Sequence, residues 1–509
     1  MKNNKSHLII WDNQKKDPIQ FSFAKLILWR SFSKQNNIIS IPELTEKWSD
    51  EIRKEYLDWI YKLGKYKIYK KSLIDSLRIR KAFSAWWFSL IVEKSNFSKS
   101  IYINDVIRIL TFKKWIKNKK FFKLTLYSSN TKLANCLRSF CKNNKINFEF
   151  IYIKSEKQDN KIKNKSNFKS FFFSLPYPLK AFIWFIYKIV YFLPLILLKI
   201  KERKNDKQNF VFFSYLFNMR NTDTNNFLYS TYWGELPSKL QADNKFSTWI
   251  HLYVKDKFLS NPFKASKIIK DLNNNNNFQT HISLFSFINL RVIYKVIFDW
   301  LFLYVRIYQI RLDKNFPKYS GFDFWDFYKN DWYNSFIGIS AVDNLIYLAL
   351  FEEVLKKCNK KTTITYLLEN QGWEIGMLSA CRKFGIKKTI GFSHATSRYW
   401  DLRNFYDLRE YLSKSLLRLP RPKILAVNSE NVLFQFLKFG YPKDEIKLTE
   451  ALRHSHLNKE NISRFNKKNK NKDKTLLLFG DYEDSNTKYQ ISVLNQLSKD
   501  TLNNLELIF

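Results

Sequence analysis

A carboxylate and an imidazole stand at matching positions after two predicted strands, and together they could move a proton. Glu369 follows a predicted strand at 362–368, and His394 follows the next one, at 388–393. The 24 residues from 370 to 393 suit a turn, one helix and a returning strand. Neighbouring parallel strands lie about 4.8 Å apart, so both side chains should emerge at the carboxyl edge, where open α/β sheets bind ligands. A carboxylate there can tune the histidine toward general-base work near neutral pH.

Seven side chains around this pair are candidate substrate-binding residues, and several have a structural alternative. They are Asn370, Trp373, Glu374, Thr396, Arg398, Asp401 and Arg403. Glu374 would lie in the first turn of the following helix, where free N–H groups favour a carboxylate, so capping competes with substrate contact. Trp373 could belong to the core, and His394 itself could simply bond the backbone at a strand end. The two arginines could pair with Asp401, whereas a free arginine would suit a phosphate or carboxylate.

The motifs of other enzyme classes are missing from the sequence. It contains no Gly-x-x-x-x-Gly-Lys-Ser/Thr loop, Gly-x-Gly-x-x-Gly, Gly-x-Ser-x-Gly or His-Glu-x-x-His, which weakens kinase, dehydrogenase and hydrolase hypotheses. The four cysteines lack metal-ligand spacing: Cys136, Cys141, Cys358 and Cys381. They are too few to cross-link so long a chain, which fits a reducing cytoplasm. We also expect no secretory signal, because residues 1–10 contain no long apolar segment. We expect neither a metal nor another cofactor.

The elements that must position the pair alternate as in an α/β protein. Strands are predicted at 210–215, 247–253, 362–368, 388–393 and 424–427, with helices at 372–384 and 430–439. This alternation predicts a Rossmann-like, doubly wound parallel sheet. A similar alternation nearer the start, with strands at 8–11, 123–127 and 148–153 and a helix at 51–63, predicts an additional N-terminal α/β domain.

We therefore expect four regions along the chain. They are an α/β domain at 1–155, a basic linker and hydrophobic helix at 156–207, a Rossmann-like domain at 208–460 and a β–α–β unit at 474–509. Lys/Asn-rich linkers are predicted at 155–170 and 466–474. One β–α–β unit cannot bury both faces of its own sheet, so the last domain is expected to be incomplete.

The most hydrophobic stretch, at 181–198, has basic flanks and interspersed aromatic residues, and Lys188 and Pro194 interrupt it. Its length is at the lower limit for crossing a bilayer. An interfacial or re-entrant helix, a packed interdomain helix and a true span are all open. The apolar segment 288–310 is divided by charged residues, which favours an amphipathic helix.

The formal net charge of +42 raises the question of nucleic-acid binding. The basic residues are mostly lysines, and they are spread along the chain together with abundant asparagine and isoleucine. Such a distribution is typical of solvated surface charge, and a membrane surface with anionic lipids is the next interpretation. We expect no nucleic-acid partner.

Segments along nearly the whole chain resemble the bacterial surface carbohydrate (O-antigen type) biosynthesis proteins, which are related to GT-B glycosyltransferases. The most specific are Glu-Asn-Gln-Gly-Trp-Glu at 369–374, His394 and Trp-Asp-Leu-Arg at 400–403. Others lie at 84–90, 93–95, 214–215, 232–237, 249–252, 440–442, 450–453 and 480–482. The resemblance implies a GT-B-like fold with an acceptor-side domain at 208–460 and the start of a donor-side domain at 474–509. Family members continue further into that donor-binding half, so the resemblance also implies that its C-terminal part is truncated here.

The leading hypothesis is a metal-independent glycosyltransferase of lipopolysaccharide O-antigen or other surface polysaccharide synthesis. It would transfer a sugar from a nucleotide-sugar to a glycan or lipid-linked glycan at the inner face of the cytoplasmic membrane. Glu369 or His394 would remove the acceptor proton, while Arg398 or Arg403 would steady phosphate or an anionic sugar. The alternative is a non-catalytic, membrane-associated scaffold of the assembly machinery.

Overall fold

The computed structural model describes most of the 509 residues. The described ranges are 6–13, 24–33, 35, 38–154, 167–198, 210–216, 219–220, 229–257, 259–274, 278–457, 475–480, 484–498, 500, 502 and 506–508. Most of the predicted linker 155–170, the linker 466–474 and the basic flank at 199–204 lie outside these residues. The chain divides into two compact units, Met1–Arg453 and His454–Phe509.

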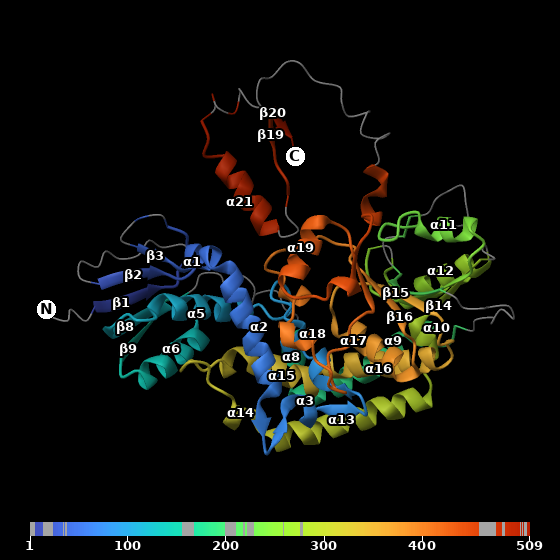
Figure 1. The fold of residues 1–509 in the computed structure, drawn as a ribbon, viewed down its shortest axis with the longest axis horizontal. Coiled ribbons are helices and arrows are strands. Elements are labelled where there is room, and N and C mark those ends of the chain that lie inside the picture. Colours follow the sequence, from blue (N-terminus) through green and yellow to red (C-terminus); the bar gives the residue numbers. More distant parts are fainter. Residues whose placement is uncertain are drawn as a thin grey trace. The chain divides into compact units, whose positions relative to one another are not determined.

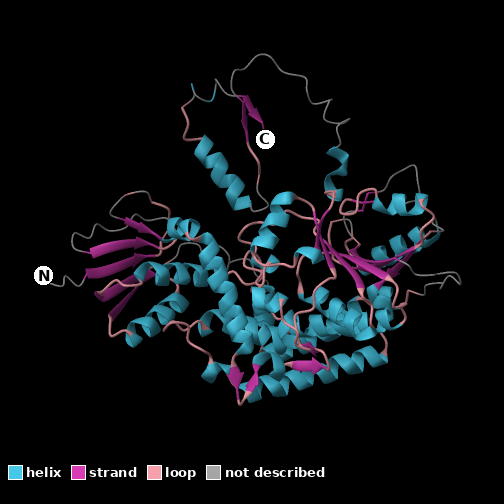
Figure 2. Ribbon diagram, viewed as in Figure 1, coloured by secondary structure: helices cyan, strands magenta, loops and turns pink. Residues whose placement is uncertain are grey.

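The larger sheet of the first unit has seven strands, and every pairing in it is parallel (Figure 2). In spatial order the strands are β14 (Gln279–Ser283), β13 (Ser247–Leu252), β10 (Phe210–Tyr215), β15 (Thr363–Leu367), β16 (Lys388–Phe392), β17 (Ile424–Val427) and β18 (Ile446–Leu448). The chain order runs outward in one direction from β10 and then reverses at β15. This is the topological switch point of a Rossmann-like sheet, so the predicted doubly wound fold is confirmed.

Helices connect these strands (Figure 1). They are α11 (Leu236–Ala242), α12 (Pro262–Asn274), α13 (Leu290–Ile310), α14 (Leu312–Asn315), α15 (Trp325–Phe336), α16 (Ile339–Lys356), α17 (Gly372–Phe384), α18 (Leu408–Tyr411) and α19 (Glu430–Lys438). Helices α16 and α17 pack directly on each other. A Cβ at Gly372 would lie 2.6 Å from the Oδ1 atom of Asn344, so a larger residue at the start of α17 would have to displace this side chain.

A second parallel sheet lies nearer the start of the chain and repeats this strand order. Its strands are β3 (Ile38–Ser40), β2 (Ala24–Leu28), β1 (Ser6–Trp11), β8 (Phe121–Ser128) and β9 (Asn147–Tyr152). Its helices include α1 (Ile41–Lys47), α2 (Ser49–Lys65), α5 (Ile103–Ile116) and α6 (Thr131–Asn143). The prediction of α/β structure with strands near 8–11, 123–127 and 148–153 is confirmed.

Short elements complete the first unit between its two sheets and around them. They are β4 (Lys67–Ile68), β5 (Lys71–Ser72), α3 (Leu73–Ser76), β6 (Arg78–Arg80), β7 (Phe83–Ser84), α4 (Leu90–Glu93), α8 (Asn167–Ser174), β11 (Met219–Arg220) and β12 (Tyr229–Ser230). The second unit contains a β–α–β motif in which β19 (Thr475–Leu477) pairs in parallel with β20 (Glu506–Ile508). Its helix, α21, spans Asp484–Leu494.

The hydrophobic stretch at 181–198 forms two helices, α9 (Tyr177–Tyr191) and α10 (Leu193–Ile196). Pro194 stands in the first turn of α10, where a missing N–H is tolerated, and the continuous helix ends before it. Among the described residues no single helix has the length and apolar character needed to cross a bilayer. The helices α15 and α16 meet that criterion only as a pair, and they are bent by 41° at their junction.

Candidate functional site

The structure brings Glu369 and His394 together at the carboxyl edge of the seven-stranded sheet. Strands β15 and β16 are hydrogen-bonded neighbours, and the Nε2 atom of His394 lies 3.5 Å from the Oε1 atom of Glu369. The side chain of Glu369 is 27% exposed, whereas that of His394 is only 2% exposed and packs edge-on against the ring of Tyr232. Glu369 can therefore contact a ligand, whereas His394 contacts Glu369 from the buried side.

Glu374 fixes the loop that presents Glu369. Its carboxylate is buried and accepts backbone N–H bonds from Glu369 at 3.0 Å, Asn370 at 3.0 Å and Gln371 at 3.1 Å. Burial raises the pKa of Glu374 well above its ordinary value, although these N–H bonds act in the opposite direction. Its contacts correspond to the capping alternative, because the carboxylate faces backbone donors of the loop and first turn.

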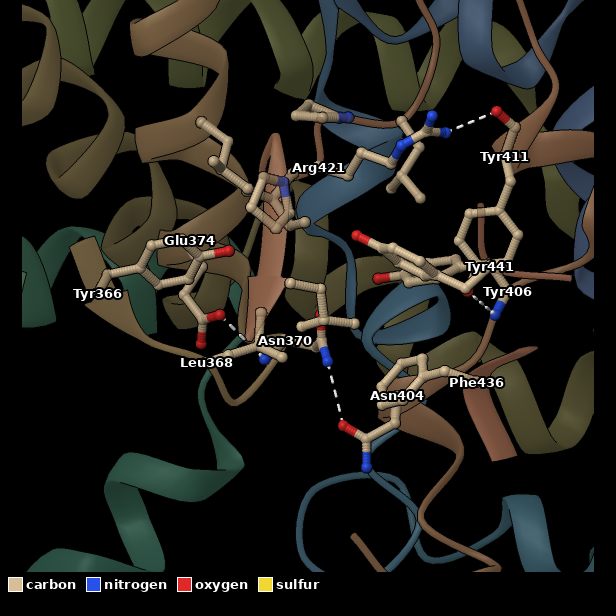
Figure 3. Close-up of a pocket in the computed structure, with 16 residues that line it drawn as sticks. Tyr366, Leu368, Asn370, Glu374, Asn404, Tyr406, Tyr411, Arg421, Phe436 and Tyr441 are labelled. Atoms are coloured by element: carbon tan, nitrogen blue, oxygen red, sulfur yellow. Dashed lines mark hydrogen bonds between the residues drawn. The ribbon is translucent and has the colours of Figure 1, made fainter. Parts of the chain in front are cut away.

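Asn370 belongs to the same loop and adopts a left-handed backbone conformation with φ of 56°. Figure 3 shows its side-chain amide directed at Asn404, with the Nδ2 atom 3.1 Å from Oδ1. Asparagine tolerates this region of backbone space better than most residues. The turn between β15 and α17 is thus held from both sides, which keeps Glu369 in place.

Tyr215, at the end of β10, links the switch point to this loop. Its hydroxyl donates to the Oε2 atom of Glu369 at 3.3 Å and accepts from the Nε1 atom of Trp373 at 3.1 Å. Gln371 also donates to Glu369. Burial alone would raise the pKa of Glu369, but the bonds from His394 and Gln371 and nearby positive charge outweigh it and lower this pKa. The carboxylate is therefore ionised at neutral pH.

An open pocket of about 440 Å³ lies beside Glu369, and its walls are rich in polar groups. Its lining includes Glu93, Lys99, Lys188, Tyr215, Asp343, Asn344, Tyr347, Glu369, Gln371 and Trp373. Two carboxylates in it are paired with lysines: the buried Glu93 with Lys99 at 2.6 Å, and the partly exposed Asp343 with Lys188 at 2.7 Å. Charged, amide and aromatic groups therefore converge at the edge of the sheet where its strand order reverses.

The other predicted site residues lie in different environments. Arg403 is paired with Asp401 through Nε at 2.9 Å and Nη2 at 2.7 Å, and this carboxylate raises the pKa of the guanidinium. Thr396 and Arg398 are exposed, and the guanidinium of Arg398 lies 5.5 Å from the ring centroid of Phe97. Among the predicted residues, Glu369 and Trp373 line the open pocket. The salt-bridge alternative thus describes Arg403.

A second, smaller cavity is lined by Asn370, Glu374, Asn404 and several tyrosines, and Figure 3 shows how they converge. The room inside it amounts to about 20 Å³, enough for a single water molecule but not for a sugar. Near it, Arg53 is fully buried and donates to the carbonyl oxygen of Tyr399 at 2.6 Å. These contacts hold the loop that follows His394, so the cavity belongs to the scaffold of the site.

Several residues of the open pocket were not predicted from the sequence. Tyr215, Gln371, Glu93, Lys188 and Asp343 were not proposed as site residues, yet all line it. One signal was available, since Lys188 is a charge inside an otherwise apolar stretch and thus needs a partner. No group of three or more His, Cys, Asp or Glu side chains within the described ranges is arranged to hold a metal ion.

The fold and the site together define an α/β protein with two parallel, Rossmann-ordered sheets and a polar pocket at the switch point of the larger one. No protein-family model, no curated protein and no solved structure matches this chain.

Proposed function

We propose that this chain is a GT-B-like glycosyltransferase of bacterial surface polysaccharide synthesis, acting on a glycan or lipid-linked glycan. The observation that carries the proposal is the ionised carboxylate of Glu369, which faces a polar pocket at the switch point of a Rossmann-like sheet. Such a carboxylate can accept the proton of an attacking hydroxyl group. The donor would be a nucleotide-sugar.

The pocket suits an acceptor with many hydroxyl groups. The carboxylate of Asp343 can accept hydroxyl hydrogens, Gln371 can donate or accept, and Tyr347 supplies aromatic surface. Bound in this way, an acceptor hydroxyl would stand beside Glu369. The volume of about 440 Å³ is within the usual range for small-molecule sites.

In the proposed reaction, the acceptor oxygen forms a bond to the anomeric carbon of the donor sugar. Glu369 takes the hydroxyl proton, and the nucleoside diphosphate leaves with the electrons of the broken glycosidic bond. His394 is a positioning residue, because its side chain is 2% exposed and its Nε2 atom faces Glu369. Arg398 or Arg403 would steady phosphate, because a guanidinium group matches phosphate geometry.

The test compares Glu369→Gln with His394→Gln in two assays: surface glycan length in a strain that lacks the endogenous gene, and the rate of sugar transfer by the purified protein across a range of pH. Glu369→Gln should reduce glycan extension by at least about 100-fold, the usual scale for a general base. His394→Gln should retain more activity than Glu369→Gln. In the pH–rate profile of this variant, the acid limb should move to higher pH, because Glu369 loses a partner that lowers its pKa, and the alkaline limb should stay unchanged. Glu43→Gln, at an exposed position, is the matched control. Full activity of both site variants in folded protein would exclude the assignment.

A non-catalytic, membrane-associated scaffold is the second candidate. The observation in its favour is the outer side of α9, where Phe182, Ile186 and Val190 are each about half exposed to solvent. Such a protein would contact the inner face of the cytoplasmic membrane without turning over substrate. Transfer of sugar from any nucleotide-sugar by the purified chain would rule out this candidate.

A further inference from the structure

The long helix α13 exposes a continuous apolar stripe. Eight large hydrophobic side chains along it are between 37% and 84% exposed: Leu290, Tyr294, Ile297, Phe298, Leu301, Tyr304, Val305 and Tyr308. They recur every three or four residues, so they share one face of the helix. The helix has 21 residues and is about 32 Å long at 1.5 Å per residue. Scattered exposed hydrophobic residues are normal, whereas a contiguous stripe of this length marks an interaction surface.

The opposite face of α13 is firmly anchored, so its orientation is well defined. Val292, Val296 and Leu303 are buried there, and the helix packs against α16 (Figure 1). Arg80 binds the carboxylate of Asp299 through both Nη atoms, at 2.7 and 2.5 Å, which ties the helix to β6. The apolar stripe is therefore the side that this packing leaves uncovered.

The charge along the helix selects the kind of partner. Asp299 is the single acidic residue of α13, and it is buried and paired. The basic residues beside the stripe include Arg291, whose side chain is 70% exposed with its Nε atom 3.9 Å from a carboxylate oxygen of Glu353, and Arg311 just after the helix. Three of the eight exposed side chains are tyrosines, which prefer the boundary between water and hydrocarbon. Basic and aromatic residues around an apolar stripe are the composition of helices that lie in an anionic membrane surface.

A second copy of this chain fits the stripe less well. Two such faces brought together would oppose arginine to arginine without exposed acidic groups on α13 to pair with them. Each copy also carries a formal net charge of +42. Anionic lipid headgroups supply the missing negative charge, and their acyl chains accept the apolar side chains.

We propose that α13 is a membrane-docking helix that lies in the interface of an anionic lipid bilayer. This inference rests on the membrane contact within the proposed function and assigns it to a specific surface. It is independent of sugar transfer, because none of the eight residues of the stripe lines the pocket beside Glu369. Docking would hold the protein at the surface that carries lipid-linked acceptors.

The test measures co-sedimentation of the full chain with vesicles of phosphatidylcholine alone or with about one third phosphatidylglycerol. The full chain should sediment with the anionic vesicles. Phe298→Glu combined with Leu301→Glu should weaken this binding by more than about tenfold, because charge replaces apolar groups at the interface. Phe434→Glu on α19 is the matched control, since Phe434 and Phe298 are both 59% exposed, and it should bind as the unmodified chain does.

Two outcomes would overturn the docking proposal. One is unchanged vesicle binding by the double variant. The other is a stable dimer of the full chain that the double variant dissociates, without vesicle binding by either protein. A transfer assay with a water-soluble acceptor separates this result from the proposed activity. Loss of vesicle binding with turnover intact supports docking alone, whereas loss of turnover in Glu369→Gln with vesicle binding intact bears on catalysis alone.

Discussion

Lys94 offers a sharp test of the electrostatics behind the pocket. Its side chain is fully buried, and its Nζ atom lies 2.5 Å from the carbonyl oxygen of Val92 and 3.9 Å from the ring centroid of Tyr406. Burial lowers the pKa of Lys94 to about 7, although neighbouring carboxylates, Glu93 foremost, act in the opposite direction. Folding therefore hides an ammonium group without fully compensating its lost hydration.

The magnitude follows from the two pKa values. The ordinary value is 10.5 and the folded value about 7, so the difference, 10.5 − 7 = 3.5, corresponds to about 5 kcal/mol. Between these two pH values the unfolded chain binds more protons than the folded one. Stability should therefore rise by about 1.4 kcal/mol per pH unit across this window. Below pH 7 both states hold the proton, and the full cost of burial applies.

The variant Lys94→Met removes this titration and keeps the length of the side chain. The variant also loses a hydrogen bond and a cation–π contact, which together stabilise the unmodified protein by about 3 kcal/mol. This loss cancels part of the roughly 5 kcal/mol gained by removing the buried charge. Near pH 6.5 the variant should therefore be more stable than the unmodified chain by about 2 kcal/mol, and this advantage should disappear and reverse as the pH rises toward 9.5. The exposed Lys47→Met is the control and should show no such pH dependence.

Urea unfolding followed by tryptophan fluorescence, repeated across this pH range, measures the difference between the two proteins. The decisive quantity is how this difference in unfolding free energy changes with pH. That change depends on the titration of Lys94, whereas the packing of the new side chain adds a contribution that does not vary with pH. A difference in unfolding free energy that stays constant from about pH 7 to 9.5 would refute the reasoning.

Two further predictions concern the loops that hold the site. Arg53→Met should destabilise the protein by about 1–3 kcal/mol, because the carbonyl oxygen of Tyr399 would lose the buried guanidinium as its hydrogen-bond donor. Faster hydrogen exchange at 398–405 would accompany this, and unchanged exchange there would contradict the assigned role. Gly372→Ala should cost about 1–3 kcal/mol in thermal unfolding, since the new Cβ would clash with Asn344. Sugar transfer should fall with it, and normal stability together with normal transfer would show that this contact does not position Glu369.

The strands predicted from the sequence are those whose own residues are mostly apolar. The segments at 210–215 and 424–427 are apolar runs, and they form β10 and β17 at those positions. Strand β14 is different, because its sequence Gln-Thr-His-Ile-Ser is largely polar. It is buried in the sheet because His281 bonds His251 at 3.0 Å and Asn273 bonds the backbone of His281. Those partners come from other elements, so periodicity alone could not reveal the strand.

The site residues also fall into those that the sequence could predict and those that it could not. Glu369 and His394 follow consecutive strands, so parallel pairing of neighbours was enough to bring them together. Tyr215 joins them because the crossover through α13 and α16 returns the chain to the other side of β10, which places β10 beside β15. That reversal depends on the whole domain. Residues on β10 and α16 could therefore not be assigned to the pocket before the topology was known.

The hydrophobic stretch at 181–198 shows why some alternatives could not be separated by sequence. Packing between domains and contact with a membrane were treated as competing roles, yet they concern different faces of α9. Ala181, Phe185 and Lys188 are buried, and Lys188 pairs with Asp343 in the wall of the pocket. Phe182 and Ile186, each one position further along, face outward. Successive residues of a helix are rotated by about 100°. When nearly all residues are apolar, the sequence does not show which face of the helix is covered. Lys188 alone marks the buried face of α9, because it needs a charged partner inside the protein.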